Sequence, residues 1–248
     1  MTAPLYHEHP QLREAPGVVR SITPDGGVVL EGSLFYPQGG GQPGDRGALV
    51  AGGTRIPIAD SLRGEQGEIV LVPEQPAAVL GPGTEVVQLV DAERRDRHTR
   101  LHTALHLLSV VLPYPVTGGA IGAEKGRLDF AMAELPAPKE ELEERLRALV
   151  AADYPVTTEW IGEEELAANP SLVKTLSVCP PAGAGRIRLV RIGEGNPPID
   201  LQPCGGTHVA GTAAIGEVRL GKVEKKGRQN RRVNLHLADS PGFPGPRE

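Results

Sequence analysis

The chain has 248 residues, of which 39% are hydrophobic and 23% are charged, a composition typical of folded globular proteins. The 32 glycines and 24 prolines follow no Gly-x-y period, which excludes collagen, and no apolar run is long enough to cross a bilayer. A net charge of −5 argues against a surface that binds nucleic acid everywhere, and an aromatic content of 3% argues against an aromatic stacking platform for single strands.

Cysteine content and the first residues bear on the cellular location. Two cysteines are too few for a disulfide scaffold, and the N-terminal residues show neither the basic nor the apolar region of a signal peptide. We therefore expect a cytoplasmic protein without membrane association.

The first ninety residues predict short strands separated by turns rich in glycine and proline. The expected strands cover residues 17–22, 26–36, 47–50, 54–59, 68–72 and 84–90. Short strands at this spacing indicate a small β-barrel or a sandwich.

The pattern changes at Asp91. Leucines recur at three- and four-residue spacing through residues 101–112, which predicts a helix that Pro113 ends. Further helices are expected over 138–155 and 162–169, and strands over 127–132, 186–193, 214–227 and 231–237, the last two as a hairpin. We predict an α+β fold with a β-barrel domain over 1–90 and a second domain over 91–248, in which helices pack against an antiparallel sheet.

Two pairs of side chains together predict a metal site. His102 and His106 are four residues apart on the long predicted helix, so their imidazoles lie on one face, one turn apart. Cys204 and His208 have the same spacing across a Gly-Gly turn, which is expected to let thiolate and imidazole converge. Three nitrogens and one sulfur suit Zn²⁺. Either pair alone is also common among ordinary surface or core residues, so the prediction depends on both.

These residues resemble the motifs of a known family. HTALH (102–106) and CGGTH (204–208) occur together in the editing domain of alanyl-tRNA synthetase and in its free-standing relatives, the AlaX proteins. FYPQGGGQPGDRG (35–47) is similar to the glycine-rich motif of the longer members, and KGRQNRRV (226–233) to the strand that ends the fold. The resemblance runs from about residue 20 to residue 237 and includes no aminoacylation domain, unlike a synthetase. The glycine-rich domain is absent from the shortest AlaX form, and the residues after the last strand are too few for the extra C-terminal domain of the longest form, so the chain resembles the medium-length form.

The resemblance implies trans-editing: hydrolysis of the ester that joins a wrong amino acid to tRNA(Ala), chiefly serine, with glycine as a further candidate. It implies a zinc ion held by His102, His106, Cys204 and His208. It also implies that the pocket which distinguishes amino acids lies near Gly39, Gly40, Gly41 and Gln42.

The sequence leaves open the way in which zinc would act. Zinc can lower the pKa of a bound water to about 7 or stabilise an oxyanion, but four protein ligands are typical of a closed structural site. Either one ligand is displaced, or the coordination expands to five, or the zinc only positions the amino group or the 3′-terminal adenosine.

Other polar residues are candidates for contacts around the reaction. Thr103 can offer its hydroxyl to the substrate or bond back to its own helix. Gln42 is a candidate polar contact of the pocket, because its glycine neighbours leave the backbone open to close approach. Asp200 and Gln202 precede the CGGTH turn and can orient a ligating imidazole.

Residues 219–232 form a basic segment, with seven lysines and arginines against one glutamate. Such charges on a hairpin can bind the phosphates of tRNA, and Arg228 and Arg231 are the candidates for this contact. A solvated hairpin without a ligand is the alternative.

Two other functions compete with editing. A zinc hydrolase of peptides or other esters is one, although HTALH lacks the glutamate that follows the first histidine in zinc peptidases. A non-catalytic tRNA-binding module, in which zinc only connects helix and turn, is the other. The sequence gives no indication of the oligomeric state.

Overall fold

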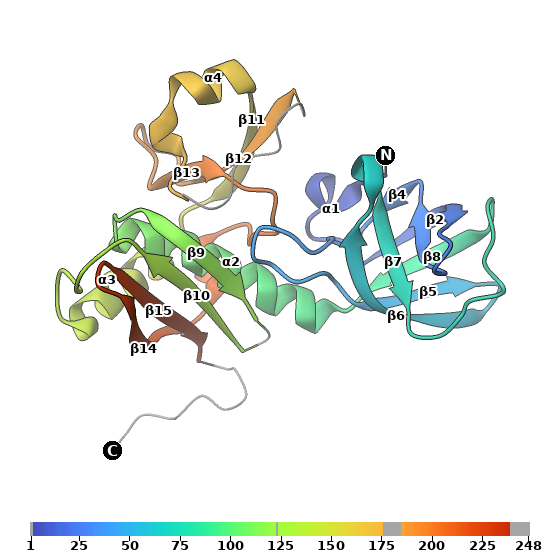
Figure 1. Ribbon diagram of the computed structural model, residues 1–248, viewed down its shortest axis with the longest axis horizontal. Coiled ribbons are helices and arrows are strands. Elements are labelled where there is room, and N and C mark those ends of the chain that lie inside the picture. Colours follow the sequence, from blue (N-terminus) through green and yellow to red (C-terminus); the bar gives the residue numbers. More distant parts are fainter. Residues whose placement is uncertain (1, 123, 176–184, 239–248) are drawn as a thin grey trace. The chain divides into compact units, whose positions relative to one another are not determined.

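The computed structural model describes residues 2–122, 124–175 and 185–238, and the chain divides into two units, Met1–His98 and Thr99–Glu248 (Figure 1). The expected α+β fold with a small β-barrel is confirmed. Among the described residues, no helix has both the length and the apolar character that a membrane crossing requires.

Unit 1 is built around a closed antiparallel barrel with the strand order β2-β3-β7-β6-β5-β8. Alternating side chains of these strands fill the barrel with residues such as Val28, Leu49 and Ile58. The strands are β2 (Glu14–Ile22), β3 (Val28–Leu30), β5 (Gly47–Ala51), β6 (Thr54–Arg63), β7 (Ile69–Pro73) and β8 (Glu85–Val90). A 3₁₀ turn, Glu65–Gly67, joins β6 to β7.

The expected strand 26–36 is only partly correct. β3 ends at Leu30, and β4 (Gly32–Ser33) pairs instead with β1 (Ala3–Pro4), which leads into the short helix α1 (Leu5–Glu8). The backbone N–H of Leu34 then donates to the side-chain oxygen of Gln88 at 2.9 Å, so it no longer contributes to a strand ladder.

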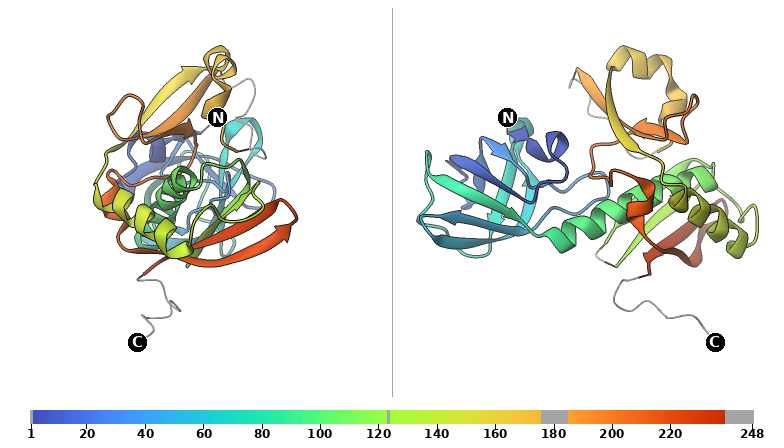
Figure 2. Two further views of the ribbon diagram at one scale, coloured as in Figure 1. Left: turned by 90° about the vertical axis from the view of Figure 1, so that its left-hand side faces the viewer. Right: turned by 180° about the vertical axis from the view of Figure 1, so that it is seen from behind.

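Unit 2 contains a four-stranded antiparallel sheet with the order β14-β15-β10-β9. The strands are β9 (Val116–Ile121), β10 (Lys125–Phe130), β14 (Val218–Gly227) and β15 (Asn230–Leu237), and β14 and β15 form the expected hairpin. α2 (Ala92–Val111), within which the unit boundary falls, and α3 (Lys139–Ala151) cover one face of this sheet (Figure 2). Leu101, Leu108, Leu146 and Val233 belong to the core between them.

A smaller antiparallel sheet in unit 2 consists of β11 (Val156–Gly162), β12 (Arg186–Ile192) and β13 (Asp200–Pro203). α4 (Glu163–Ala168) and a 3₁₀ turn, Pro170–Leu172, accompany it, whereas a second 3₁₀ turn, Thr212–Ile215, contributes Ile215 to the core of the large sheet. One face carries its own apolar core of Leu166, Ile187 and Leu189. The sequence did not indicate β9, β11 or β13, because none shows a clear alternation of apolar and polar residues. β9 contains two glycines, β11 a Thr-Thr-Glu run, and β13 is only four residues long.

Candidate metal centre

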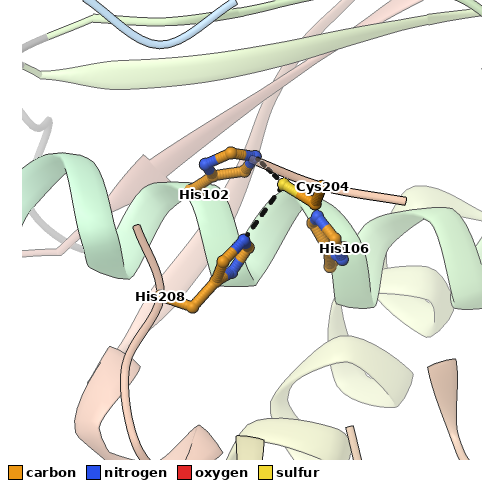
Figure 3. Close-up of side chains that lie close together, drawn as sticks. All are labelled: His102, His106, Cys204 and His208. Carbon is orange, nitrogen blue, oxygen red and sulfur yellow. Dashed lines mark hydrogen bonds between the residues drawn. The ribbon is translucent and has the colours of Figure 1, made fainter. Parts of the chain in front are cut away.

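The four predicted ligands come together inside unit 2. His102 and His106 project from α2, and Cys204 and His208 belong to the loop that follows β13, so that their ligand atoms all lie within 4.8 Å of one another (Figure 3). The Cys204 Sγ is 3.4 Å from Nε2 of His102 and 3.3 Å from Nε2 of His208. Neighbouring ligands on a tetrahedral zinc, with bonds of about 2.0–2.3 Å, are about 3.3–3.6 Å apart. The donor set is of the kind that binds zinc, and two of its sulfur-to-nitrogen distances have the length of a tetrahedral edge.

Arg188 of β12 shapes the ligand turn between Cys204 and His208. Arg188 is 9% exposed, and its guanidinium donates to the carbonyl of Cys204 at 2.8 Å and to that of Gly206 at 3.0 Å. The expectation that the Gly-Gly pair makes the turn possible is not supported. Neither Gly205 nor Gly206 has a positive φ, and a Cβ at Gly205 would meet nothing within 4 Å. Arg188 could not be predicted from the sequence, since nothing in a strand pattern marks an arginine as buried.

A carboxylate orients His106. The Nδ1 of His106 lies 2.9 Å from Oδ2 of Asp200, which leaves Nε2 for a metal. The amide of Gln202 donates to the same Oδ2 at 2.7 Å, and the ammonium of Lys174 donates to Oδ1 at 2.5 Å. Asp200 and Gln202 thus have the orienting position that the sequence suggested, whereas Lys174, 26 residues earlier, belongs to no recognisable motif.

Thr103 contacts His208 rather than open space. Its hydroxyl is fully buried and lies 3.1 Å from Nδ1 of His208, again leaving Nε2 for a metal. The same oxygen accepts the backbone N–H of Val209 at 3.2 Å and donates to the carbonyl of Thr99 at 3.0 Å. This geometry favours the orientation of His208, together with the predicted bond back to the helix, over a contact with substrate.

The electrostatics of the cluster place negative charge on sulfur. Burial raises the pKa of Cys204, but the neighbouring His102 and His208 outweigh this and lower it well below the usual range of a thiol. Burial and the charge of His102 lower the pKa of His208 to about 3. A thiolate and a neutral imidazole are the forms that bind metal.

His106 and Asp200 form a coupled pair. Burial lowers the pKa of His106, but the contacts with Asp200 and Cys204 prevail and raise it to about 9. Burial raises the pKa of Asp200, but His106 and Lys174 prevail and lower it to about 2. Asp200 is therefore ionised at neutral pH, and His106 holds a proton that a metal must displace.

The glycine-rich motif is a closed loop in unit 1. Gly39 and Gln42 exchange two backbone hydrogen bonds of 3.0 and 2.9 Å. Gly40 and Gly41, between them, have φ angles of +56° and +82°, as a type I′ turn requires, and glycine adopts these angles without strain. Gln42 is 1% exposed.

A buried ion pair anchors this loop. The carboxylate of Asp45 accepts the backbone N–H of Tyr36 at 2.6 Å, across the base of the loop. Nε of Arg95, in the first turn of α2, donates to Oδ2 of Asp45 at 2.9 Å, and both side chains are fully buried. The loop is consequently preformed rather than dependent on a ligand for its shape.

The predicted phosphate contacts lie on the β14–β15 hairpin. Arg228 is exposed in its turn, whereas Nη1 of Arg231 donates to the carbonyls of Gly227 and Asn230 at 3.0 Å each. Neither arginine belongs to α2 or to the ligand turn, so they are not part of the metal cluster.

Comparisons with known proteins bear on both units. Residues 187–234 match the family described as "Threonyl and Alanyl tRNA synthetase second additional domain". The chain is 32% identical to alanyl-tRNA editing protein AlaX-M of Methanosarcina acetivorans and 36% identical to that of Saccharolobus solfataricus. These alignments cover 96% and 94% of the chain and 100% and 98% of those proteins. It is also 33% identical, over 90% of its length, to 25% of the alanine–tRNA ligase of Caldivirga maquilingensis.

Proposed function

Because the chain belongs to the AlaX family of alanyl-tRNA editing proteins, we propose that it hydrolyses the ester bond of tRNA(Ala) carrying a wrong amino acid, with a zinc ion as cofactor. The observation that carries the proposal is the N₃S cluster, whose sulfur-to-nitrogen distances of 3.3 and 3.4 Å match the edges of a zinc tetrahedron. The proposed cellular location is the cytoplasm.

The proposed substrate is chiefly Ser-tRNA(Ala), with Gly-tRNA(Ala) as a second substrate. Serine carries a hydroxyl that alanine lacks, so a pocket group that hydrogen-bonds it stays unpaired when alanine is bound. An unpaired buried group of this kind costs about 1–3 kcal/mol, which is enough to spare the correct ester. Glycine lacks this hydroxyl as well and enters because it is smaller, so weaker selectivity is expected for it.

The protein groups have separate parts in this proposal. When bound, zinc supplies Lewis acidity that polarises the ester or lowers the pKa of water. Asp200 holds Nδ1 of His106, and Thr103 holds Nδ1 of His208, so both imidazoles direct Nε2 to one point. Thr103 is accordingly proposed as a positioning residue, in place of the catalytic contact considered from the sequence.

The glycine-rich loop and the basic hairpin supply the remaining contacts of the proposal. Gly39, Gly40 and Gly41 allow a close approach of backbone to the aminoacyl group, and Gln42 provides the polar contact. The exposed Arg228 binds a tRNA phosphate, with Arg231 beside it across the turn.

Loss of serine from Ser-tRNA(Ala) tests the proposal, with wild type compared with Cys204→Ala. The wild type is expected to release serine, and the variant to lose metal and activity while keeping its circular dichroism spectrum. A variant that keeps full activity would exclude a catalytic metal. A wild type that binds tRNA but releases no serine would favour the non-catalytic module, and one that cleaves unrelated esters equally fast would favour a general esterase.

A further inference from the structure

The only tryptophan of the sequence, Trp160, lies on the surface of the small sheet in unit 2. Its side chain is 45% exposed, although tryptophan is the largest apolar side chain. The guanidinium carbon of Arg186 lies 5.6 Å from the centroid of its ring, at cation–π distance. An exposed indole with a guanidinium over its ring brings an aromatic surface and a positive charge together.

The strand register places Trp160 on the face that leads to the metal centre. Trp160 pairs with Arg188 across β11 and β12, and directly opposed side chains project from the same face, about 4.5–5.5 Å apart at Cβ. Arg188 donates to the carbonyl of Cys204, so a single side chain separates Trp160 from the ligand turn.

The next strand continues this face. Gln202 is paired with Val190, two residues after Arg188, and its amide reaches the carboxylate of Asp200 that holds His106. On the opposite face of the sheet, Ile187 and Leu189 pack against Leu166 of α4. Trp160 therefore shares its face with residues that contact the metal ligands.

We propose that Trp160, flanked by Arg186, stacks against a nucleobase at the single-stranded 3′ end of the aminoacylated RNA. This inference rests on the proposed function, because hydrolysis of the ester brings that end of the RNA to the metal centre. A stacked base fits the flat ring, and the guanidinium of Arg186 complements the adjacent phosphate. The low aromatic content excludes stacking of many bases in a row, but one tryptophan suffices for one base.

Fluorescence tests the contact directly, because Trp160 is the only tryptophan and its emission reports this position alone. Metal-loaded protein is titrated with a deacylated acceptor-stem minihelix of tRNA(Ala) that ends in CCA, and with the same minihelix without its single-stranded 3′ nucleotides. Anisotropy of a 5′ label on each RNA shows when binding is saturated. Quenching by the complete minihelix alone is expected. Equal quenching by both, or none at saturation, would overturn the proposal.

Variants give an independent readout. Trp160→Ala is expected to weaken binding of the complete minihelix by about 5- to 150-fold, the range of one base–aromatic stack, whereas Trp160→Phe retains most of the affinity. Thr157→Ala, an exposed position on the opposite face of the same strand, is the matched control and should bind like wild type. Unchanged binding by Trp160→Ala would contradict stacking.

Failure of the two proposals can be told apart. If the wild type hydrolyses no Ser-tRNA(Ala), the proposed function fails, while the minihelix titration still decides whether Trp160 stacks. If the wild type is active but quenching does not depend on the 3′ nucleotides, only the stacking proposal fails.

Discussion

Replacing Asp200 by asparagine tests how the carboxylate behind His106 acts on the metal centre. Asp200 accepts three hydrogen bonds, from His106 at 2.9 Å, Gln202 at 2.7 Å and Lys174 at 2.5 Å. An asparagine amide of the same shape has one acceptor oxygen and directs N–H groups at a donor, so at least one of these bonds is lost. Loss of such a partner of a metal-bound histidine typically weakens metal binding by about 10- to 100-fold.

The carboxylate of Asp200 also strengthens the binding of the proton that competes with the metal for His106. With the pKa of His106 raised to about 9 in the metal-free protein, a proton occupies the ligand at pH 7 and weakens metal binding by about 100-fold relative to high pH. Asp200→Asn lowers this pKa, so the variant suffers less proton competition at neutral pH. The advantage of the wild type in zinc affinity is therefore expected to be larger at pH 9.5, where the proton no longer competes, than at pH 7.

Chelator competition at both pH values measures this difference, with zinc affinity as the readout. Asp129→Asn, which removes a carboxylate that binds Arg127 and Arg232 on the large sheet, is the matched control and should leave zinc affinity unchanged at either pH. A wild-type advantage that is the same at pH 7 and pH 9.5, or no advantage at all, would refute the assignment of Asp200.

Three further substitutions test side chains and backbone positions that are expected to stabilise the two units. Thr103→Val removes the acceptor of two N–H groups, Nδ1 of His208 and the backbone of Val209, so we expect a loss of about 2–4 kcal/mol in the free energy of unfolding, with Thr103→Ser restoring most of it. Urea denaturation measures both variants, and an equal loss in the two would contradict a role for the hydroxyl. Arg95→Met leaves the fully buried Asp45 unpaired and should destabilise unit 1 by about 3–5 kcal/mol, seen as a lower urea midpoint; an unchanged midpoint would disprove the importance of the pair. Gly40→Ala meets no atom within 4 Å, so only its positive φ of 56° is penalised, by about 1–2 kcal/mol; a loss of 4 kcal/mol or more would show that the loop is packed differently.

Much of the architecture was accessible from sequence because strong local patterns coincide with the elements that bury apolar surface. Turn residues separate the barrel strands, and the leucines of α2 recur at helical spacing up to the end of the helix at Val111. β9 and β11 escaped prediction because Gly118, Gly119 and the exposed threonines of β11 carry no apolar alternation. Those strands owe their existence to pairing with β10 and β12, which is long-range information.

In the candidate site, too, local features were predictable from the sequence and long-range contacts were not. The ligands were predictable because each pair is local, four residues apart, and only their convergence required the fold. Lys174 and Arg188 support Asp200 and the ligand turn through contacts that no spacing rule describes. The two glycines of CGGTH were expected to let the turn fold tightly, but neither has a positive φ, and the buried guanidinium of Arg188 donates to two carbonyls of the turn.

Discrimination between serine and alanine is the most direct test of the proposed function. Single-turnover hydrolysis of Ser-tRNA(Ala) and Ala-tRNA(Ala) by the zinc-loaded protein is the measurement, with Gly-tRNA(Ala) alongside. We expect serine to be released about 5- to 150-fold faster than alanine, which corresponds to one unpaired buried hydrogen-bonding group, and glycine at an intermediate rate. Equal rates for serine and alanine, or no release of serine by folded protein with its full complement of zinc, would contradict the assignment as an editing hydrolase.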